Sequence, residues 1–162
     1  MKKNYFLLAA ITLVVLLSGL TLAACTKTGA NGAVVIKQKG SLKIPVKNVT
    51  GTVTFFPAEV NDIYIEVMAV KAPDNSIHTA FNTCESCYTS GKGYYIQEGN
   101  EVVCQNCGMH FSIDSISAKA AGGCQPIPIF NDDRTISGDF IQIPYKVLLG
   151  KTPYFLNWKT AN

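Results

Sequence analysis

Four cysteines in two Cys-x-x-Cys pairs are the residues of this chain whose types and spacing predict chemistry. The first pair is Cys84-Glu-Ser-Cys87, and the second, after sixteen intervening residues, is Cys104-Gln-Asn-Cys107, which Gly108 follows. Two such pairs can close on one metal centre. Because thiolate is a soft ligand and hard cations prefer oxygen, an all-sulfur site selects zinc, iron or an iron–sulfur cluster. We therefore predict a thiolate metal site on these four cysteines.

The spacing leaves the metal and its use open. A structural zinc staple is the simplest interpretation, since closed four-cysteine zinc sites are common. A pair of disulfides is an alternative in an oxidising compartment. Thiol–disulfide exchange is less favoured, because redox pairs of the thioredoxin kind begin a helix and no helical period follows Cys87.

Three further residues are candidate ligands. Cys124 is left over once the two pairs are assigned, and it is interpreted either as an additional ligand or as a small buried residue. His78 and His110 flank the pairs and could bind iron, although such histidines are more often ordinary strand or loop residues. The sequence lacks a Gly-x-Ser-x-Gly motif that would favour hydrolysis.

Aromatic residues are frequent around the cysteine pairs. We expect them to form core, where they would also limit the access of solvent to a redox metal. They are Phe81, Tyr88, Tyr94, Tyr95 and Phe111.

The N-terminus has the pattern of a targeting segment. A cationic start at 1–4 precedes a mostly apolar stretch at 5–19, and Leu22-Ala-Ala-Cys25 closes the segment. That ending resembles the lipobox of bacterial lipoproteins, which implies that a signal peptide of residues 1–24 is removed and that Cys25 carries lipid. We expect the mature chain to be tethered to a membrane on its extracytoplasmic side. An uncleaved transmembrane helix is the alternative, since the apolar run approaches the roughly 20 residues that span a bilayer.

The remaining chain is long enough for one domain with a core of its own. Residues 25–32 are small and polar and are predicted to be a lipid-anchored spacer, and residues 33–162 a single metal-binding domain. The full chain has a net charge of +3, and loss of Lys2 and Lys3 with the signal peptide would leave it nearly neutral. This balance does not favour nucleic-acid binding.

Strand signals dominate the domain, so we predict a mostly β fold: a small antiparallel domain with a rubredoxin- or zinc-ribbon-like metal-binding hairpin. The hairpin at 94–103 should bring the two cysteine pairs face to face. The strand at 63–70 is expected to bury one face, and the Pro-x-Pro run at 126–128 to lie at a sheet edge. One helical turn is predicted at 145–149, and a closing strand or loop at 150–158. The predicted strands are 33–37, 49–56, 63–70, 77–81, 94–97, 101–103, 111–116 and 136–143.

Several sequence blocks together resemble the FtrD-like family of membrane iron–sulfur proteins, from about residue 63 to the C-terminus. They are residues 80–88, 91–94, 104–111 and the block Gly-Gly-Cys-Gln-Pro-Ile-Pro at 122–128. The resemblance implies an iron–sulfur centre on the four paired cysteines, with Cys124 as a candidate participant, and an association with ferrous iron uptake at the bacterial envelope. Many relatives carry membrane helices ahead of this domain, whereas here we see only a signal and a lipid site, so a direct part in transport is not expected.

A fainter similarity links the chain to Rieske-type domains, in which two ligand pairs and a Gly-Pro-rich segment follow in the same order. The histidines that bind one iron of a Rieske centre are absent here, so four thiolates should give a lower potential. We expect a non-enzymatic electron carrier or accessory that meets redox or iron-transport proteins of the envelope. The alternatives are a mononuclear iron site, or a structural-zinc module that acts through protein–protein interaction.

Overall fold

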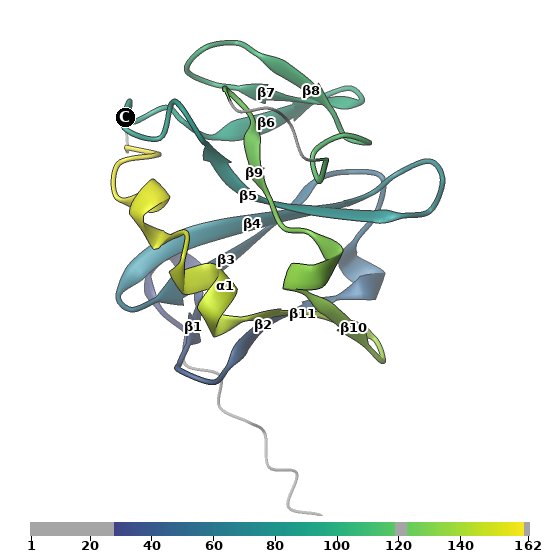
Figure 1. The fold of residues 1–162 in the computed structure, drawn as a ribbon, viewed down its shortest axis with the longest axis vertical. Helices are drawn as coiled ribbons and strands as arrows, with labels where there is room; N and C mark the ends of the chain where they lie inside the picture. The colour runs from purple at the N-terminus through teal and green to yellow at the C-terminus, as the bar shows by residue number, and fades with distance from the viewer. Residues whose placement is uncertain (1–27, 119–122, 161–162) are drawn as a thin grey trace, which may run out of the picture.

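The computed structural model describes residues 28–118 and 123–160, and their fold is mostly β, as predicted. They form a five-stranded sheet in the order β1-β3-β4-β5-β9 and two three-stranded sheets, β10-β11-β2 and β6-β7-β8. Figure 1 shows the β6-β7-β8 sheet at one end of the molecule and the β10-β11-β2 sheet at the other. The strands are β1 (Val34–Ile36), β2 (Ser41–Pro45), β3 (Thr54–Val60), β4 (Ile63–Lys71), β5 (Ile77–Cys84), β6 (Tyr95–Glu98), β7 (Glu101–Cys104), β8 (His110–Ser112), β9 (Pro126–Pro128), β10 (Thr135–Ser137) and β11 (Phe140–Pro144).

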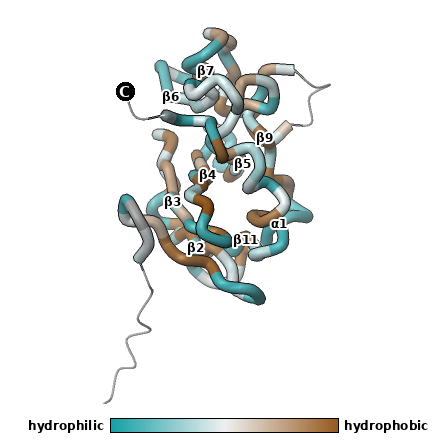
Figure 2. The backbone as a smooth tube through the Cα atoms, turned by 90° about the vertical axis from the view of Figure 1, so that its left-hand side faces the viewer, coloured by the Kyte–Doolittle hydropathy of each residue, from teal (hydrophilic) through white to brown (hydrophobic). Residues whose placement is uncertain are grey.

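The central strand β4 is buried on both faces. Ile65 and Val67 belong to one hydrophobic cluster, while Met68 and Val70 belong to a second one that also contains the buried cysteines. Successive side chains of a strand point to opposite faces, so the large sheet separates two cores. The prediction of one buried face was therefore wrong, because the small β6-β7-β8 sheet packs on the other side. Figure 2 shows hydrophobic segments around β2, β3 and β4.

The strands predicted at 49–56, 111–116 and 136–143 differ from those in the structure. The strand predicted at 49–56 begins later and runs through Pro57 as β3. Pro57 lies opposite Glu66 of β4 and before Ala58, the first residue of β3 that pairs with β1. It therefore stands where the β1 side of the strand is still unpaired, a position that tolerates proline. The strand predicted at 136–143 is two strands, β10 and β11, which turn through Gly138 at a φ of +55°. Strand β2, which pairs with β11, was not predicted.

In the C-terminal part, two of the three elements predicted from the sequence are present in the structure. The predicted helical turn is α1 (Tyr145–Leu149), and the Pro-x-Pro run forms β9 at the edge of the large sheet. Residues 150–158 were expected as a strand or loop but contain a 3-10 helix, Thr152–Phe155. Its Phe155 packs edge-on against Phe81, with ring centroids 6.0 Å apart. The strand predicted at 111–116 is shorter, since β8 ends at Ser112.

The predicted signal peptide and Cys25 lie outside the described residues. Part of the predicted spacer is in contact with the domain, because Thr28 forms a bridge to Val34 and the Gly29 N–H donates to the Ala33 carbonyl at 2.7 Å. Among the residues that the structure describes, no helix is long and apolar enough to cross a membrane.

Candidate metal centre

The first cysteine pair stands where the large sheet ends. Cys84 is the last residue of β5, and its N–H donates to the Gly93 carbonyl at 2.7 Å. The Tyr88 N–H donates to the Cys84 carbonyl at 3.1 Å, which closes the turn that carries Cys87. A Cβ at Gly93 would lie 2.6 Å from the carbonyl carbon of Cys87, so only glycine lets the chain pass this close to the turn.

The second pair repeats this arrangement on the small sheet. Cys104 is the last residue of β7, and its N–H donates to the Met109 carbonyl at 3.0 Å. The Gly108 N–H donates to the Cys104 carbonyl at 2.9 Å. Gly108 has a φ of +71°, a left-handed backbone conformation that glycine adopts without a Cβ clash. Each pair therefore sits in a tight turn, and the two turns belong to different sheets.

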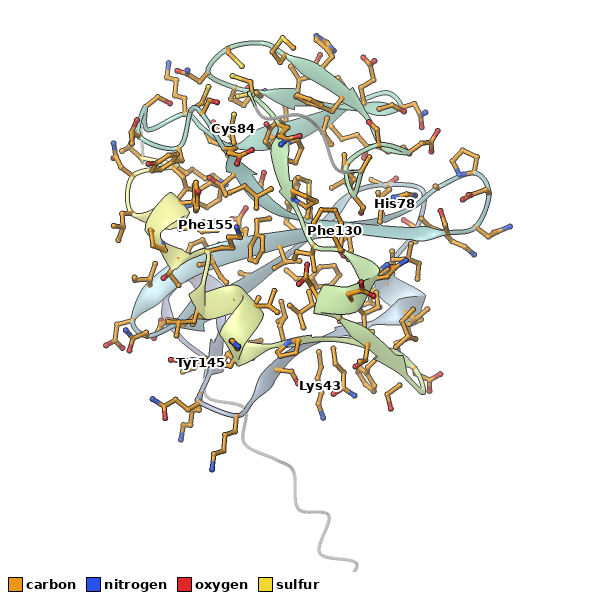
Figure 3. The ribbon with its side chains drawn as sticks, in the orientation of Figure 1. Lys43, His78, Cys84, Phe130, Tyr145 and Phe155 are labelled. Carbon is orange, nitrogen blue, oxygen red and sulfur yellow. The ribbon has the colours of Figure 1, made fainter. Side chains whose placement is uncertain are left out.

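The described cysteine sulfurs converge into one cluster of five. Cys84, Cys87 and Cys104 form a set whose sulfurs lie within 4.8 Å of one another. Cys87, Cys107 and Cys124 form a second such set, with the sulfurs of Cys87 and Cys124 3.5 Å apart. Figure 3 shows sulfur atoms gathered near the labelled Cys84, far from Lys43 and Tyr145. The four predicted ligands are thus brought together, but as two sets that share Cys87 and include Cys124.

The cluster extends from the core to the surface. Cys84 and Cys104 are fully buried and Cys87 is nearly so, whereas Cys124 is partly buried and Cys107 is exposed. All five are free thiols, so the disulfide alternative has no counterpart in this structure. One side of the cluster is shielded from water and the other side meets it.

The thiols differ in how readily they lose a proton. Burial raises the pKa of Cys104 to about 12, although the backbone N–H groups of Asn106 and Cys107 act against it. Burial likewise raises the pKa of Cys87, and hydrogen bonding to Cys107 and Cys87 raises that of Cys124. Burial alone would raise the pKa of Cys107, but the Met109 N–H and the neighbouring thiols outweigh it and lower that pKa. A metal ion that binds here must displace protons, so its affinity falls as the pH is lowered.

A tyrosine supports the presence of a ligand at these thiols. The Tyr95 side chain is fully buried, and its hydroxyl has no hydrogen-bond partner in the described structure. Burial and the adjacent Cys84 thiol raise the pKa of Tyr95, so the hydroxyl is a neutral donor beside sulfur. A buried hydroxyl without a partner costs roughly 1–3 kcal/mol. A metal-bound thiolate or an inorganic sulfide would accept a hydrogen bond from this hydroxyl. The five clustered thiols with this donor beside them therefore fit an iron–sulfur centre.

An asparagine that sequence reasoning did not single out ties the two sheets together beside the cluster. Asn82 on β5 is buried, and its Nδ2 donates to Glu66 Oε2 at 2.9 Å. Its Oδ1 accepts the Tyr95 N–H at 2.8 Å. The other carboxylate oxygen, Glu66 Oε1, accepts a hydrogen bond from the Tyr64 hydroxyl at 2.8 Å and lies 3.5 Å from Nζ of Lys159. Strand β5 also carries His78, Thr79 and Thr83, so nothing in its sequence singles out Asn82.

The two histidines lie apart from the thiol sets. Nδ1 of His110 is 2.9 Å from Glu101 Oε2, and both side chains are about half exposed. Nε2 of His78 is hydrogen-bonded to the Ser76 hydroxyl at 2.8 Å. The candidate ligands brought together by the described structure are all cysteines.

Comparison with models of known protein families shows which family the chain belongs to. The family described as "Membrane iron-sulfur containing protein FtrD-like" matches residues 49–155, which is more than half of the sequence and includes all five clustered cysteines. The protein belongs to the FtrD-like family. This confirms the resemblance stated from the sequence blocks. A search of curated proteins gives no match.

A solved structure shows a weak similarity. It is the crystal structure of the quaternary ammonium Rieske monooxygenase CntA in complex with an inhibitor, with 11% sequence identity and a TM-score of 0.44. The alignment covers 67% of this chain and 32% of that one, so the FtrD-like chain spans about a third of the length of the enzyme.

Proposed function

We propose that this FtrD-like protein is a lipid-anchored, extracytoplasmic electron carrier that holds an iron–sulfur centre and serves iron uptake at the bacterial envelope. The observation that carries the proposal is the convergence of five free thiols, buried on one side and exposed on the other, with the Tyr95 hydroxyl, which has no hydrogen-bond partner among the described residues, next to Cys84. The donors are all sulfur, which suits iron–sulfur clusters. The family description points to the same cofactor.

When bound, such a centre accepts one electron from a reduced donor and releases it to an oxidised acceptor. The residues of the chain set the conditions for that exchange. Cys84 and Cys104 hold the buried side, where Tyr95 and Phe111 pack edge-on and exclude water. Exposed Cys107 and Met109 bring the other side to the surface, where a partner can approach. Burial, solvent access and hydrogen bonds to sulfur are the properties that set the potential of such centres.

The placement of the centre suits a tethered carrier. The described domain starts beside β1, and Figure 1 shows β1 and the β6-β7-β8 sheet at different ends of the molecule. A lipid at Cys25 would therefore hold the domain at one end and leave the cysteine cluster free to face envelope redox or iron-transport proteins. Mass spectrometry of the intact protein tests the anchor: we expect a chain that begins at Cys25 and carries lipid, and a Cys25→Ser chain that lacks it.

The cofactor is tested on the full chain, purified anaerobically in detergent. We expect iron and acid-labile sulfide, with visible bands that bleach on addition of dithionite and are lost in Cys104→Ser. Ser86→Ala, an exposed residue between the first two cysteines, is the matched control and should keep the bands. A colourless wild-type protein with bound zinc, still colourless after reconstitution with iron and sulfide, would refute the carrier and leave a zinc-stapled interaction module.

The link to iron uptake is tested in cells. Replacement of the chromosomal copy by Cys104→Ser should slow growth under iron limitation and leave growth in iron-replete medium unchanged. Equal growth of both strains at every iron level would separate the protein from iron uptake without affecting the assignment of its cofactor.

A further inference from the structure

We propose that Cys124 is a fifth metal ligand and that the cluster offers two metal positions that share Cys87. Cys84, Cys87 and Cys104 form the inner position, and Cys87, Cys107 and Cys124 form the outer one. The inference deepens the proposed function, because it concerns the same thiols. It differs from the usual use of two Cys-x-x-Cys pairs, in which four cysteines close on one ion.

The distances support a shared metal on each set. Two thiolates bound to one tetrahedral ion, with metal–sulfur bonds of about 2.3 Å, lie about 3.8 Å apart. The separation of 3.5 Å between the sulfurs of Cys87 and Cys124 is close to this value. Every sulfur pair within each set lies within 4.8 Å. A single tetrahedral ion has room for four thiolates, so it leaves one of the five without a bond, whereas two positions that share Cys87 engage them all.

The backbone holds Cys124 in place without help from its sulfur. Pro126 pairs with Cys84 where β9 meets β5, which brings the chain before β9 to the first cysteine turn. Gln125 fastens it there twice: its carbonyl accepts the Glu85 N–H at 3.1 Å, and its Nε2 donates to Glu85 Oε2 at 2.8 Å. Gly123, with a φ of +103°, supplies the turn that precedes Cys124. A thiol fixed in this way is preorganised to bind metal.

Its burial separates this role from that of a plain core residue. A lone cysteine is usually a small, fully buried residue. Cys124 is only partly buried, and its sulfur faces the sulfur of Cys87 at the open side of the cluster, beside exposed Cys107. Cys87 belongs to both sets and is buried between the inner and outer thiols. These positions suit a bridging thiolate at Cys87 and a terminal one at Cys124.

Cadmium is the probe, because it binds thiolates and needs neither sulfide nor a redox reaction. The metal-free full chain, reduced and kept anaerobic in detergent, is titrated with Cd²⁺ while thiolate-to-metal absorption is followed. We expect two Cd²⁺ per wild-type chain. In Cys124→Ala the first ion should bind as in wild type and the second at least tenfold more weakly, while Ser86→Ala should match wild type. Two ions bound with unchanged affinity in Cys124→Ala would overturn the proposal, as would one ion in the wild type.

Cadmium-113 NMR of the wild-type protein gives an answer that does not depend on the folding of any variant. Two resonances coupled to each other through a shared thiolate are expected, and a single resonance would refute two positions. The iron and sulfide content of the native protein, measured separately, tests the proposed function. Two cadmium sites in a protein that never holds iron would keep this inference and reject the electron carrier, and an iron–sulfur protein with one cadmium site would do the reverse.

Discussion

Replacement of Asn82 by alanine should destabilise the domain more than any other exchange of a described asparagine. Asn82 is 1% exposed and makes two hydrogen bonds, one to the Glu66 carboxylate and one from the Tyr95 N–H. Asn82→Ala removes both at once. The bond to a charged group is worth roughly 1.5–3 kcal/mol, and the orphaned, buried Tyr95 N–H costs roughly 1–3 kcal/mol.

In Asn82→Ala, the Glu66 carboxylate keeps Tyr64 and Lys159 as partners. The loss of its bond to Asn82 therefore does not leave this buried charge unpaired. We therefore expect the free energy of unfolding to fall by about 3–5 kcal/mol. For a domain of this size that corresponds to a midpoint of thermal unfolding lower by roughly 10–20 °C. Because small domains are stable by about 5–15 kcal/mol, most of the protein should still fold at room temperature.

The assay is denaturant unfolding of the metal-free, reduced protein, followed by far-ultraviolet circular dichroism. Asn100→Ala is the matched control, since Asn100 is exposed in the turn between β6 and β7. Its replacement should cost less than about 0.5 kcal/mol, as is usual for a surface exchange. A loss below about 1 kcal/mol for Asn82→Ala would refute the reasoning, since it would mean that neither hydrogen bond of Asn82 contributes measurably to the stability of the domain.

Two further predictions concern the residues around the thiols. The Tyr95 hydroxyl is buried without a partner, so Tyr95→Phe should leave the metal-free protein as stable as wild type or more stable by up to about 2 kcal/mol. The same exchange should lower the reduction potential of the loaded protein, because it removes a donor to sulfur; a raised potential, or a marked loss of stability without metal, would contradict this role. An added Cβ at Gly93 would clash with the backbone of Cys87, so Gly93→Ala should weaken cadmium binding and destabilise the domain by more than about 2 kcal/mol. Gly51→Ala is its control, since a Cβ at exposed Gly51 meets no atom within 4 Å and the residue has no positive φ; an effect of Gly93→Ala no larger than that of the control would argue against the close approach.

Local sequence patterns predicted the parts of this fold whose causes are local. Runs of β-branched and aromatic residues marked β4, β5, β6 and β7, and cysteine spacing marked both turns of the metal centre. The helical turn at Tyr145–Leu149 and the edge position of the Pro-x-Pro run also followed from short segments.

Features that depend on distant partners could not be predicted in this way. Strand β2 is short and is stabilised by its pairing with β11, about a hundred residues later in the chain. The second face of β4 is buried by the small sheet that covers it. The apolar run at 67–70 is typical of a strand buried on both faces, but it does not show which element covers the second face. Cys124 reaches Cys87 only because β9 pairs with β5 across forty residues of chain, which left its role open in the sequence. Long-range pairing is the common reason for these differences.

The position of the cysteines between two sheets bears on the choice between a structural staple and a redox centre. The first pair belongs to the large sheet and the second to the small one, so a bound metal joins them. Asn82, which is bonded to Glu66 within the large sheet, already reaches the small sheet through the Tyr95 N–H without any metal. Structural zinc sites are closed four-ligand sites, whereas this cluster opens to solvent at Cys107 and carries a fifth thiol. A staple needs neither the open side nor the extra sulfur, and an electron carrier needs surface access to exchange electrons with a partner, so the open side favours the electron carrier.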